Sequence, residues 1–282
     1  MHIKNKTKNR RFFDIPYLFR TFSDALCQFI MQNITVTGLN LDIQWKEKKK
    51  NFKLIENSMK LINTDLILLP EMFPTGFYMK PEEVADRNSE TLEWMKKFAK
   101  EKNCAVAGSA SIMEGENFYN RFYFVEPNGN YHQYDKRHLF SFSGEDQTYS
   151  AGKERIVVNY KGWRILLQVC YDLRFPVFAR NNDDYDAILY VANWPAVRID
   201  AWKTLLKARA IENLAYVFGL NRIGTDGNNL HYPESSYCYA PDGTLVSTTE
   251  NNIVSAEFNA EKLLKFREKF RFLNDRDSFE II

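Results

Sequence analysis

The 282-residue chain lacks the features that mark metal-binding, disulfide-bonded, membrane-spanning or nucleic-acid-binding proteins. Its 4 cysteines are far apart and form no CxxC or Cys/His metal-ligand pattern. No stretch of about 18 consecutive apolar residues could span a membrane. The formal net charge of +2 leaves no strongly basic surface for nucleic acid. We therefore expect a cytoplasmic protein with reduced thiols that uses no metal or cofactor and binds neither nucleic acid nor a membrane.

The chain does contain enough apolar sequence for a large core. Hydrophobic residues make up 45% of it and aromatic residues 15%, so folding can bury a substantial interior. No internal repeat, low-complexity linker or break in composition separates two domains. We predict one continuous domain over residues 31–282.

The first 30 residues differ from the rest of the chain. Five basic residues fall within the first 11 positions, and the first strand-like pattern begins only at Ile34–Leu41. Asp14 and Asp24 interrupt the basic segment and no small-residue cleavage site is evident, which argues against a targeting signal. We predict that residues 1–30 are an extension, either disordered or translated from an incorrect upstream start, and that Met31 is the native start. A tail that packs on the domain is the alternative.

Strand and helix patterns alternate after this extension. Helical patterns predict three helices, over Lys46–Ile62, from an N-cap at Ser89 through Lys102, and over Ala201–Asn213. Apolar runs and turn residues predict strands over Leu66–Leu69 and Cys104–Ile112 and hairpins at Pro127–Asn130, Lys161–Gly162 and Pro241–Thr244. Hairpins mixed with crossover helices predict two sheets rather than a single parallel sheet.

One apolar run ends in a cysteine. Residues 163–169 have the pattern of a buried strand, which places Cys170 at its carboxyl end, where open α/β sheets bind ligands. We expect the backbone N–H groups of the following turn to lower the pKa of this thiol. Cysteine is also among the most buried residue types and often only packs. This segment alone leaves both a nucleophile and a core residue open.

Two further segments place ionisable groups at strand ends. The strand Leu66–Leu69 runs into Glu71, and an alternating pattern from Tyr131 runs into the charged cluster around Lys136. Either segment by itself is typical of an exposed turn. A carboxylate, an ammonium and a thiol, however, supply a base, an oxyanion partner and a nucleophile, which are the groups that acyl transfer requires.

The sequence around these three residues resembles the signature motifs of the nitrilase, or carbon–nitrogen hydrolase, superfamily. The motifs occur in the family order, at Pro70–Phe73, Tyr134–Phe140 and Val169–Pro176. The intervals from glutamate to lysine and from lysine to cysteine are 65 and 34 residues, which fit the Glu-Lys-Cys triad of that family. Later segments, including Val191–Ala196 and Asn221–Gly224, are more similar to the bacterial omega-amidase (YafV-like) subgroup than to true nitrilases.

The resemblance implies an α/β fold of the four-layer αββα sandwich type, built as a single domain. It also implies the roles of the triad. Cys170 would form a thioester, Glu71 would take and return the proton, and Lys136 together with the backbone N–H of Tyr171 would stabilise the oxyanion.

A fourth catalytic residue is implied by the segment Phe142–Tyr149, which matches the region of a second active-site glutamate in the family. Glu145 is the aligned residue, and we expect it to orient Lys136 and to hydrogen-bond the substrate amide or the water. Asp146 is the alternative if the alignment shifts by one position. An ordinary acidic residue of a polar loop is the remaining interpretation.

The subgroup resemblance also implies a substrate. It is the terminal amide of short 2-oxo dicarboxylic acid monoamides, such as 2-oxoglutaramate and 2-oxosuccinamate, which is hydrolysed to the acid and ammonia. The substrate carboxylate needs a cationic or N–H-rich partner. We expect Arg198 to bind it, with Arg174 and Lys203 as alternatives that each have a surface or structural interpretation. Phe77 and Trp194 are candidate pocket walls, although aromatic residues pack in the core by default.

Several other polar residues favour structural roles. Asp172 and Arg174 are expected to fix the nucleophile turn by hydrogen bonds. Arg209 and Glu212 are expected to form a local polar pair. His138 is a candidate base for a thiol protease, an interpretation that the family resemblance disfavours.

Two other functions stay open at this point. A nitrilase or carbamoylase would use the same thiol on a different electrophile, and a non-enzymatic relative would keep the fold as a binding module. Such a relative usually lacks a member of the triad, and this chain retains all three. The resemblance further implies a homodimer or a larger symmetric assembly.

Overall fold

Two mixed β-sheets pack against each other in the computed structural model, which describes residues 31–281. The larger sheet has the strand order β13-β14-β1-β2-β3-β4-β5. Its strands are β1 (Ile34–Leu39), β2 (Leu66–Leu68), β3 (Ala105–Glu114), β4 (Asn117–Val125), β5 (Tyr131–Asp135), β13 (Thr248–Glu250) and β14 (Ile253–Phe258). Strands β1, β2 and β3 are parallel, and the remaining neighbours pair antiparallel.

The smaller sheet has the strand order β12-β9-β8-β7-β6. Its strands are β6 (Val157–Tyr160), β7 (Trp163–Val169), β8 (Ala187–Ala192), β9 (Tyr216–Asn221) and β12 (Tyr237–Tyr239). Strands β7, β8 and β9 are parallel, so the segments that follow them leave the sheet at the same edge. A two-stranded ribbon of β10 (Gly224–Thr225) and β11 (His231–Tyr232) lies outside both sheets.

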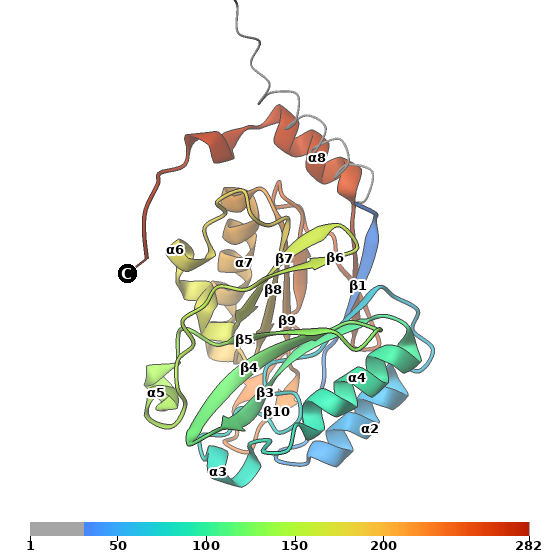
Figure 1. Ribbon diagram of the computed structural model, residues 1–282, viewed down its shortest axis with the longest axis vertical. Coiled ribbons are helices and arrows are strands. Elements are labelled where there is room, and N and C mark those ends of the chain that lie inside the picture. Colours follow the sequence, from blue (N-terminus) through green and yellow to red (C-terminus); the bar gives the residue numbers. More distant parts are fainter. Residues whose placement is uncertain (1–30, 282) are drawn as a thin grey trace, which may run out of the picture. The chain divides into compact units, whose positions relative to one another are not determined.

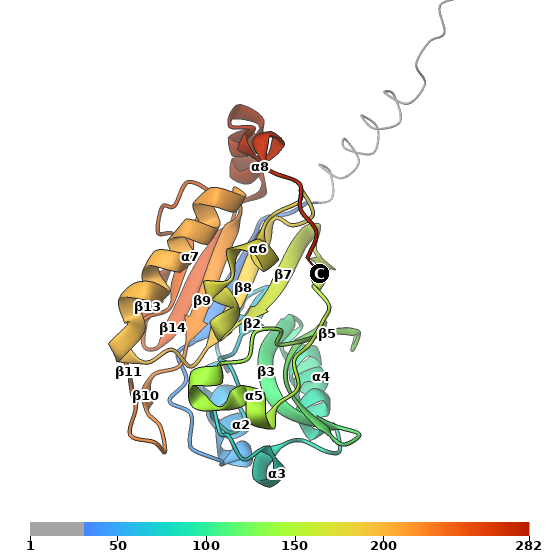
Figure 2. The same ribbon diagram turned by 90° about the vertical axis from the view of Figure 1, so that its left-hand side faces the viewer.

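Helices cover the outer face of each sheet (Figures 1 and 2). The larger sheet is covered by α2 (Lys48–Ser58) and α4 (Glu90–Lys102), and the smaller one by α6 (Pro176–Ala179) and α7 (Ile199–Asn213). The remaining helices are α3 (Pro81–Val84), α5 (Glu145–Thr148) and α8 (Ala260–Lys269), and 3₁₀ turns occur at Ser141–Ser143, Cys170–Arg174, Ala196–Arg198 and Phe272–Asp275. This layering confirms the predicted four-layer αββα sandwich.

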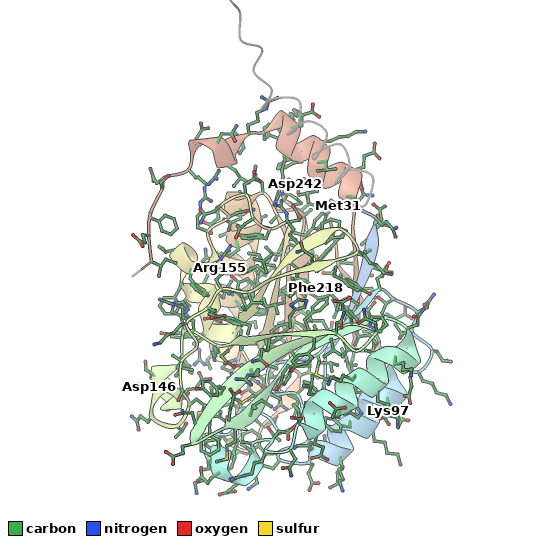
Figure 3. All side chains as sticks on the ribbon, viewed as in Figure 1. Met31, Lys97, Asp146, Arg155, Phe218 and Asp242 are labelled. Atoms are coloured by element: carbon green, nitrogen blue, oxygen red, sulfur yellow. The ribbon has the colours of Figure 1, made fainter. Side chains whose placement is uncertain are left out.

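The two sheets approach each other closely at β1 and β9. A side chain at Gly38 would place its Cβ 2.4 Å from Cδ1 of Leu220, so any larger residue there would require the Leu220 side chain to move. Leu220 and Phe218 are fully buried, and Figure 3 shows Phe218 in the interior and Lys97 on the outer side of α4. The apolar faces of both sheets therefore form one core, and the chain from Gln32 onward forms one compact unit. The predicted domain bounds of 31–282 stay a prediction.

The extension predicted over residues 1–30 lies outside the described residues. Its boundary, its order and the choice of Met31 as the start therefore stay predictions. Within residues 31–281, no helix is long and apolar enough to cross a membrane.

The predicted elements are present, but several of their boundaries differ. The first helix is shorter at both ends than Lys46–Ile62, and β3 runs on to Glu114. The hairpins at Pro127–Asn130 and Lys161–Gly162 join antiparallel strands as predicted. The turn at Pro241–Thr244 closes only an isolated bridge between Tyr239 and Leu245, because the next strand, β13, pairs with β14 of the other sheet.

The expected N-cap of α4 is wrong. Ser89 precedes the helix, but it has φ 58° and its side chain makes no capping bond. Asp86 caps the helix instead. Its carboxylate accepts hydrogen bonds from the backbone N–H groups of Asn88 and Glu90 at 3.1 Å and of Thr91 at 2.5 Å. The capping side chain is therefore that of Asp86, which the preceding loop brings back to the amino end of the helix.

We expect Asp86→Ala to lower the free energy of unfolding by about 1–2 kcal/mol at pH 7, because α4 loses the acceptor for its first turn. Ser89→Ala is the matched control at the expected cap position and should stay within about 0.5 kcal/mol of the wild type. Urea unfolding monitored by circular dichroism measures both values.

The stability gap between the wild type and Asp86→Ala should also depend on pH. Burial disfavours the charged form of Asp86, but the Thr91 N–H, Lys48 and the Asn88 N–H outweigh it and hold the pKa below its usual value. A depressed carboxyl pKa contributes stability that is present above the unfolded-state pKa of about 4 and is lost as the pH falls through the folded-state pKa. The difference in free energy of unfolding between the two proteins should therefore shrink in acid. A difference that grows in acid would contradict the capping role of Asp86.

Candidate active site

Cys170 stands directly after β7. The strand ends at Val169, and a 3₁₀ turn over Cys170–Arg174 follows it. Cys170 has φ 44°, in the left-handed region that residues with a Cβ rarely adopt. Such a conformation costs about 1–3 kcal/mol and persists only where the surrounding contacts fix it.

Asp172 supplies contacts that fix this turn. Its fully buried carboxylate accepts hydrogen bonds from the Val169 N–H at 2.9 Å and from the Tyr134 hydroxyl at 2.8 Å. Its other oxygen is 3.0 Å from the backbone nitrogen and 2.7 Å from Nδ1 of His138. Because Tyr134 and His138 lie on either side of Lys136 in the chain, Asp172 ties the cysteine turn to the segment that carries the lysine.

Lys136 places its ammonium between two carboxylates. Its Nζ lies 2.9 Å from Oε1 of Glu71 and 2.8 Å from Oε2 of Glu145, and all three side chains are fully buried. Glu71 follows β2, Lys136 follows β5 and Glu145 begins α5, so three distant segments meet at this point. Asp146, the alternative to Glu145, is exposed at the surface (Figure 3).

Amide groups complete the hydrogen bonding of the two carboxylates. Nδ2 of Asn120 donates to Oε1 of Glu71 at 2.8 Å and to Oε1 of Glu145 at 3.1 Å. The backbone N–H of Asn193 donates to Oε2 of Glu71 at 2.9 Å, and that of Phe140 donates to Oε2 of Glu145 at 2.6 Å. Every carboxylate oxygen therefore has a donor, which offsets part of the cost of burying these charges.

The buried charges shift one another's protonation. Burial by itself would lower the pKa of Lys136, but Glu145 and Glu71 outweigh it and raise this pKa above its usual value. Burial raises the pKa of Glu145, while Lys136 opposes this shift. Lys136 is therefore a permanent positive charge at neutral pH.

The thiol of Cys170 is protonated in this environment. Burial raises its pKa well above the usual value, and the negative charge of Glu71 raises it further, while Lys136 opposes both. The expectation that the pKa of this thiol is lowered is therefore wrong, although Lys136 acts in the lowering direction. The same shifts place Cys170 within electrostatic range of Glu71 and Lys136, so a carboxylate lies near a protonated thiol.

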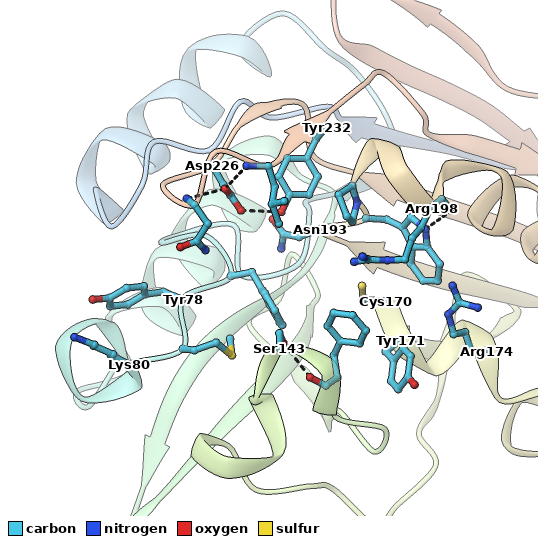
Figure 4. A pocket seen from close by; sticks show the side chains of 17 residues that line it. Tyr78, Lys80, Ser143, Cys170, Tyr171, Arg174, Asn193, Arg198, Asp226 and Tyr232 are labelled. Atoms are coloured by element: carbon cyan, nitrogen blue, oxygen red, sulfur yellow. Dashed lines mark hydrogen bonds between the residues drawn. The ribbon is translucent and has the colours of Figure 1, made fainter.

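A pocket of about 390 Å³ opens at Cys170 (Figure 4). Its wall includes Tyr171 and four further residues expected from the sequence, namely Phe77, Arg174, Trp194 and Arg198. In the part of the chain that the structure describes, no group of three or more His, Cys, Asp or Glu side chains could hold a metal ion.

Two of the three expected cations lie at this pocket. The Arg198 guanidinium lies 5.0 Å from the ring centroid of Phe140, and that of Arg174 lies 5.1 Å from the ring of Trp194. Both residues line the pocket. Lys203 instead lies over Tyr237 and is not part of the wall, so the structure does not support it as a carboxylate partner.

Only some of the residues that were expected to have structural roles make the expected hydrogen bonds. Asp172 fixes the turn, but among the described hydrogen bonds Arg174 has none to it. Arg209 donates to Glu212 at 2.8 Å, as expected, and also to the carbonyl oxygen of Leu173 at 2.7 Å.

His138 also supports the nucleophile turn. It is bonded to Asp172 and stacks on Phe175 with ring centroids 3.8 Å apart. Its ring nitrogen is thus engaged by the turn, which suits a supporting residue better than a base for Cys170.

The sequence reasoning missed four residues of the site: Asn120, Asn193, Asp226 and Tyr232. Asn120 is a fully buried polar residue in β4, a strand in which Phe118, Tyr119, Phe122 and Tyr123 are aromatic. A polar side chain in such a run indicates a buried hydrogen-bonding role. Asp226 follows β10 and Tyr232 ends β11, both in the segment that comes after β9, and no local pattern marks them.

Known proteins resemble this chain along most of its length. The carbon-nitrogen hydrolase family matches residues 27–267. Omega-amidase YafV from Yersinia enterocolitica is 43% identical over 256 residues, which cover 89% of this chain and 100% of that protein. A 2-oxoglutaramate amidase from Bacillus subtilis is 32% identical, with 86% and 96% of the two chains covered. The crystal structure of a CN-hydrolase superfamily protein from Xanthomonas campestris, with an arsenic adduct in its active site, has a TM-score of 0.86 and 38% identity over 89% of this chain and 100% of that one.

We expect Asn120→Ala to lower the free energy of unfolding by about 1–3 kcal/mol, because the buried oxygens of Glu71 and Glu145 each lose a donor. Asn117→Ala is the matched control, since it removes the same side chain from the exposed start of the same strand. It should change stability by no more than about 0.5 kcal/mol. Equal effects of both variants in urea unfolding would show that Asn120 does not support the carboxylates.

Proposed function

The chain belongs to the carbon–nitrogen hydrolase family, and we propose that it is an omega-amidase. Its substrates are the terminal amides of short 2-oxo dicarboxylic acid monoamides, 2-oxoglutaramate and 2-oxosuccinamate, which it converts to the acid and ammonia. The observation that supports the proposal is the buried pair of Glu71 and Lys136, whose charges act on the thiol of Cys170, a residue that lines the pocket. The omega-amidase and 2-oxoglutaramate amidase relatives support the choice of substrate.

The reaction begins with transfer of the Cys170 proton to Glu71. Because burial and Glu71 keep the thiol protonated, the thiolate forms only as the sulfur attacks the amide carbonyl. The attack creates a tetrahedral intermediate with a negative oxygen. The Lys136 ammonium and the backbone N–H of Tyr171 stabilise it, and each well-aimed donor contributes about 2.7–4 kcal/mol in comparable sites.

The second half of the reaction uses the same acid and base. Glu71 gives its proton to the departing nitrogen, ammonia leaves, and the acyl group stays on Cys170 as a thioester. Water then loses a proton to Glu71 and attacks the thioester, and that proton returns to the sulfur as the acid leaves. Glu145 keeps the Lys136 ammonium in position, at 2.8 Å, while Glu71 changes charge.

The substrate carboxylate needs a cation at the far end of the pocket. Arg198 is our candidate because its guanidinium faces the pocket and donates no hydrogen bond to the described protein groups. Arg174 is the second candidate on the same wall, and Phe77 and Trp194 are apolar walls between them and the reacting carbon.

Oligomeric state and location complete the proposal. We propose a cytoplasmic location because the described cysteines, Cys104, Cys170 and Cys238, are all free thiols and the cytoplasm keeps thiols reduced. We also propose a symmetric homodimer, on the family resemblance alone. The partner molecules are small amides.

We expect Cys170→Ala to reduce ammonia release from 2-oxoglutaramate to background, a loss on the order of 10⁶-fold. Cys104→Ala is the matched control because it removes a buried thiol that is not part of the pocket, and it should retain activity. Full turnover after stoichiometric alkylation of Cys170 by iodoacetamide would reject the nucleophile. The rate of ammonia release should also be measured with the corresponding nitrile and with an N-carbamoyl compound. A higher rate with either of these than with the amide would assign the protein a nitrilase or carbamoylase activity instead.

Arg198→Ala should raise KM for 2-oxoglutaramate by about 10- to 100-fold, since a hydrogen bond to a charged group is lost, with a smaller effect on kcat. Lys203→Ala removes a cation outside the pocket and should leave KM unchanged. Steady-state kinetics with both variants measures the difference. An unchanged KM for Arg198→Ala would assign the carboxylate to Arg174 instead.

A further inference from the structure

Two residues that line the pocket with Cys170 each carry an oxygen that can accept a hydrogen bond but has no proton to donate to a ligand. These oxygens are Oδ1 of Asn193 and the hydroxyl oxygen of Tyr232. Figure 4 shows both side chains among those that line the pocket with Cys170. Neither is part of the Glu-Lys-Cys arrangement.

The orientation of the Asn193 amide is fixed by Glu71. Its Nδ2 donates to the carbonyl oxygen of Glu71 at 2.7 Å and lies 3.4 Å from Oε2. Rotation of the amide would bring its oxygen against that carbonyl oxygen, so Oδ1 must point the other way. There it is buried and, within residues 31–281, has no hydrogen-bond partner. A buried acceptor without a donor is costly, which favours a ligand that supplies one.

The proton of the Tyr232 hydroxyl is committed to Asp226. The hydroxyl donates to Oδ2 of Asp226 at 2.8 Å. Oδ1 of Asp226 accepts from the backbone N–H groups of Asn228 and Leu230 at 2.8 and 3.0 Å, so this carboxylate is held as an acceptor. Burial and Asp226 raise the pKa of Tyr232, and the hydroxyl therefore stays protonated. Only its lone pairs remain for a ligand.

Both atoms lie close to the reacting groups. Asn193 is bonded to Glu71, the group that exchanges protons in the proposed reaction. A negative charge on Cys170 raises the pKa of the Tyr232 hydroxyl, so the tyrosine lies within electrostatic range of the sulfur. In the proposed reaction the nitrogen of the carboxamide receives its proton from Glu71, so it must come within reach of Glu71, to which Asn193 is bonded.

We propose that Asn193 Oδ1 and the Tyr232 hydroxyl oxygen accept the two N–H bonds of the substrate carboxamide and thereby select amides over esters and over the acid product. This inference rests on the proposed amidase function. An ester has no N–H to donate. The product carboxylate brings only acceptors and a negative charge against two acceptor oxygens, which favours its release. With both N–H bonds held, the nitrogen lone pair is left to receive the proton from Glu71.

A comparison of matched substrates tests this assignment. The substrates are 2-oxoglutaramate and the corresponding omega-methyl ester, and formation of 2-oxoglutarate is the readout for both. Tyr232→Phe should lower kcat/KM for the amide by about 3- to 10-fold, the effect of one neutral hydrogen bond, and leave the ester unchanged. Asn193→Ala also removes a hydrogen-bond donor to Glu71, so it should lower kcat/KM for both substrates. The loss should be larger for the amide, so the ratio of amide to ester kcat/KM should fall, as in Tyr232→Phe.

Tyr160→Phe is the matched control. It removes a hydroxyl from a buried tyrosine that bonds the carbonyl oxygen of Asp65, outside the pocket, and it should not change the ratio. Equal losses for amide and ester in Tyr232→Phe would assign the hydroxyl a purely structural role and overturn its part of the inference. An unchanged ratio of amide to ester kcat/KM in Asn193→Ala would overturn the part of the inference that concerns Asn193. If the wild type hydrolyses neither substrate, the proposed function itself fails.

Discussion

The buried ammonium of Lys136 is the interaction on which the rest of the site depends. A lysine without solvent is costly to bury unless opposite charges surround it. Glu71 and Glu145 do so at 2.9 and 2.8 Å. Because two carboxylates share one cation, the proton uptake of Glu71 in the proposed reaction still leaves Lys136 paired with Glu145. In the proposed reaction, Glu145 thus keeps a negative charge beside the Lys136 ammonium while Glu71 carries the proton.

The fold brings these charges together from strand ends. Glu71 and Cys170 follow β2 and β7, which belong to different sheets, and the packing of the two sheets sets their separation. Asp172 adds a direct link between the cysteine turn and the lysine segment. The left-handed conformation of Cys170 is therefore held by hydrogen bonds from two sides.

The pocket wall combines cations with hydrogen-bond acceptors. Arg174 and Arg198 carry positive charge, and Asn193 and Tyr232 carry acceptor oxygens. The proposed substrate, with one carboxylate and one carboxamide, can pair with both kinds of group. In that proposal, a product with two carboxylates brings negative charge to the acceptor oxygens.

The sequence by itself determined the strands that end at Leu68 and Val169, because an apolar run defines a buried strand locally, and the motif order indicated Glu71, Lys136 and Cys170. It also predicted the two packed sheets from alternating hairpins and crossover helices. Only the tertiary structure decided that Asp86 rather than Ser89 caps α4, that the thiol pKa rises, and that Asn120 and Tyr232 belong to the site. Each of these depends on burial and on charges from segments far apart in the chain, which no local pattern encodes.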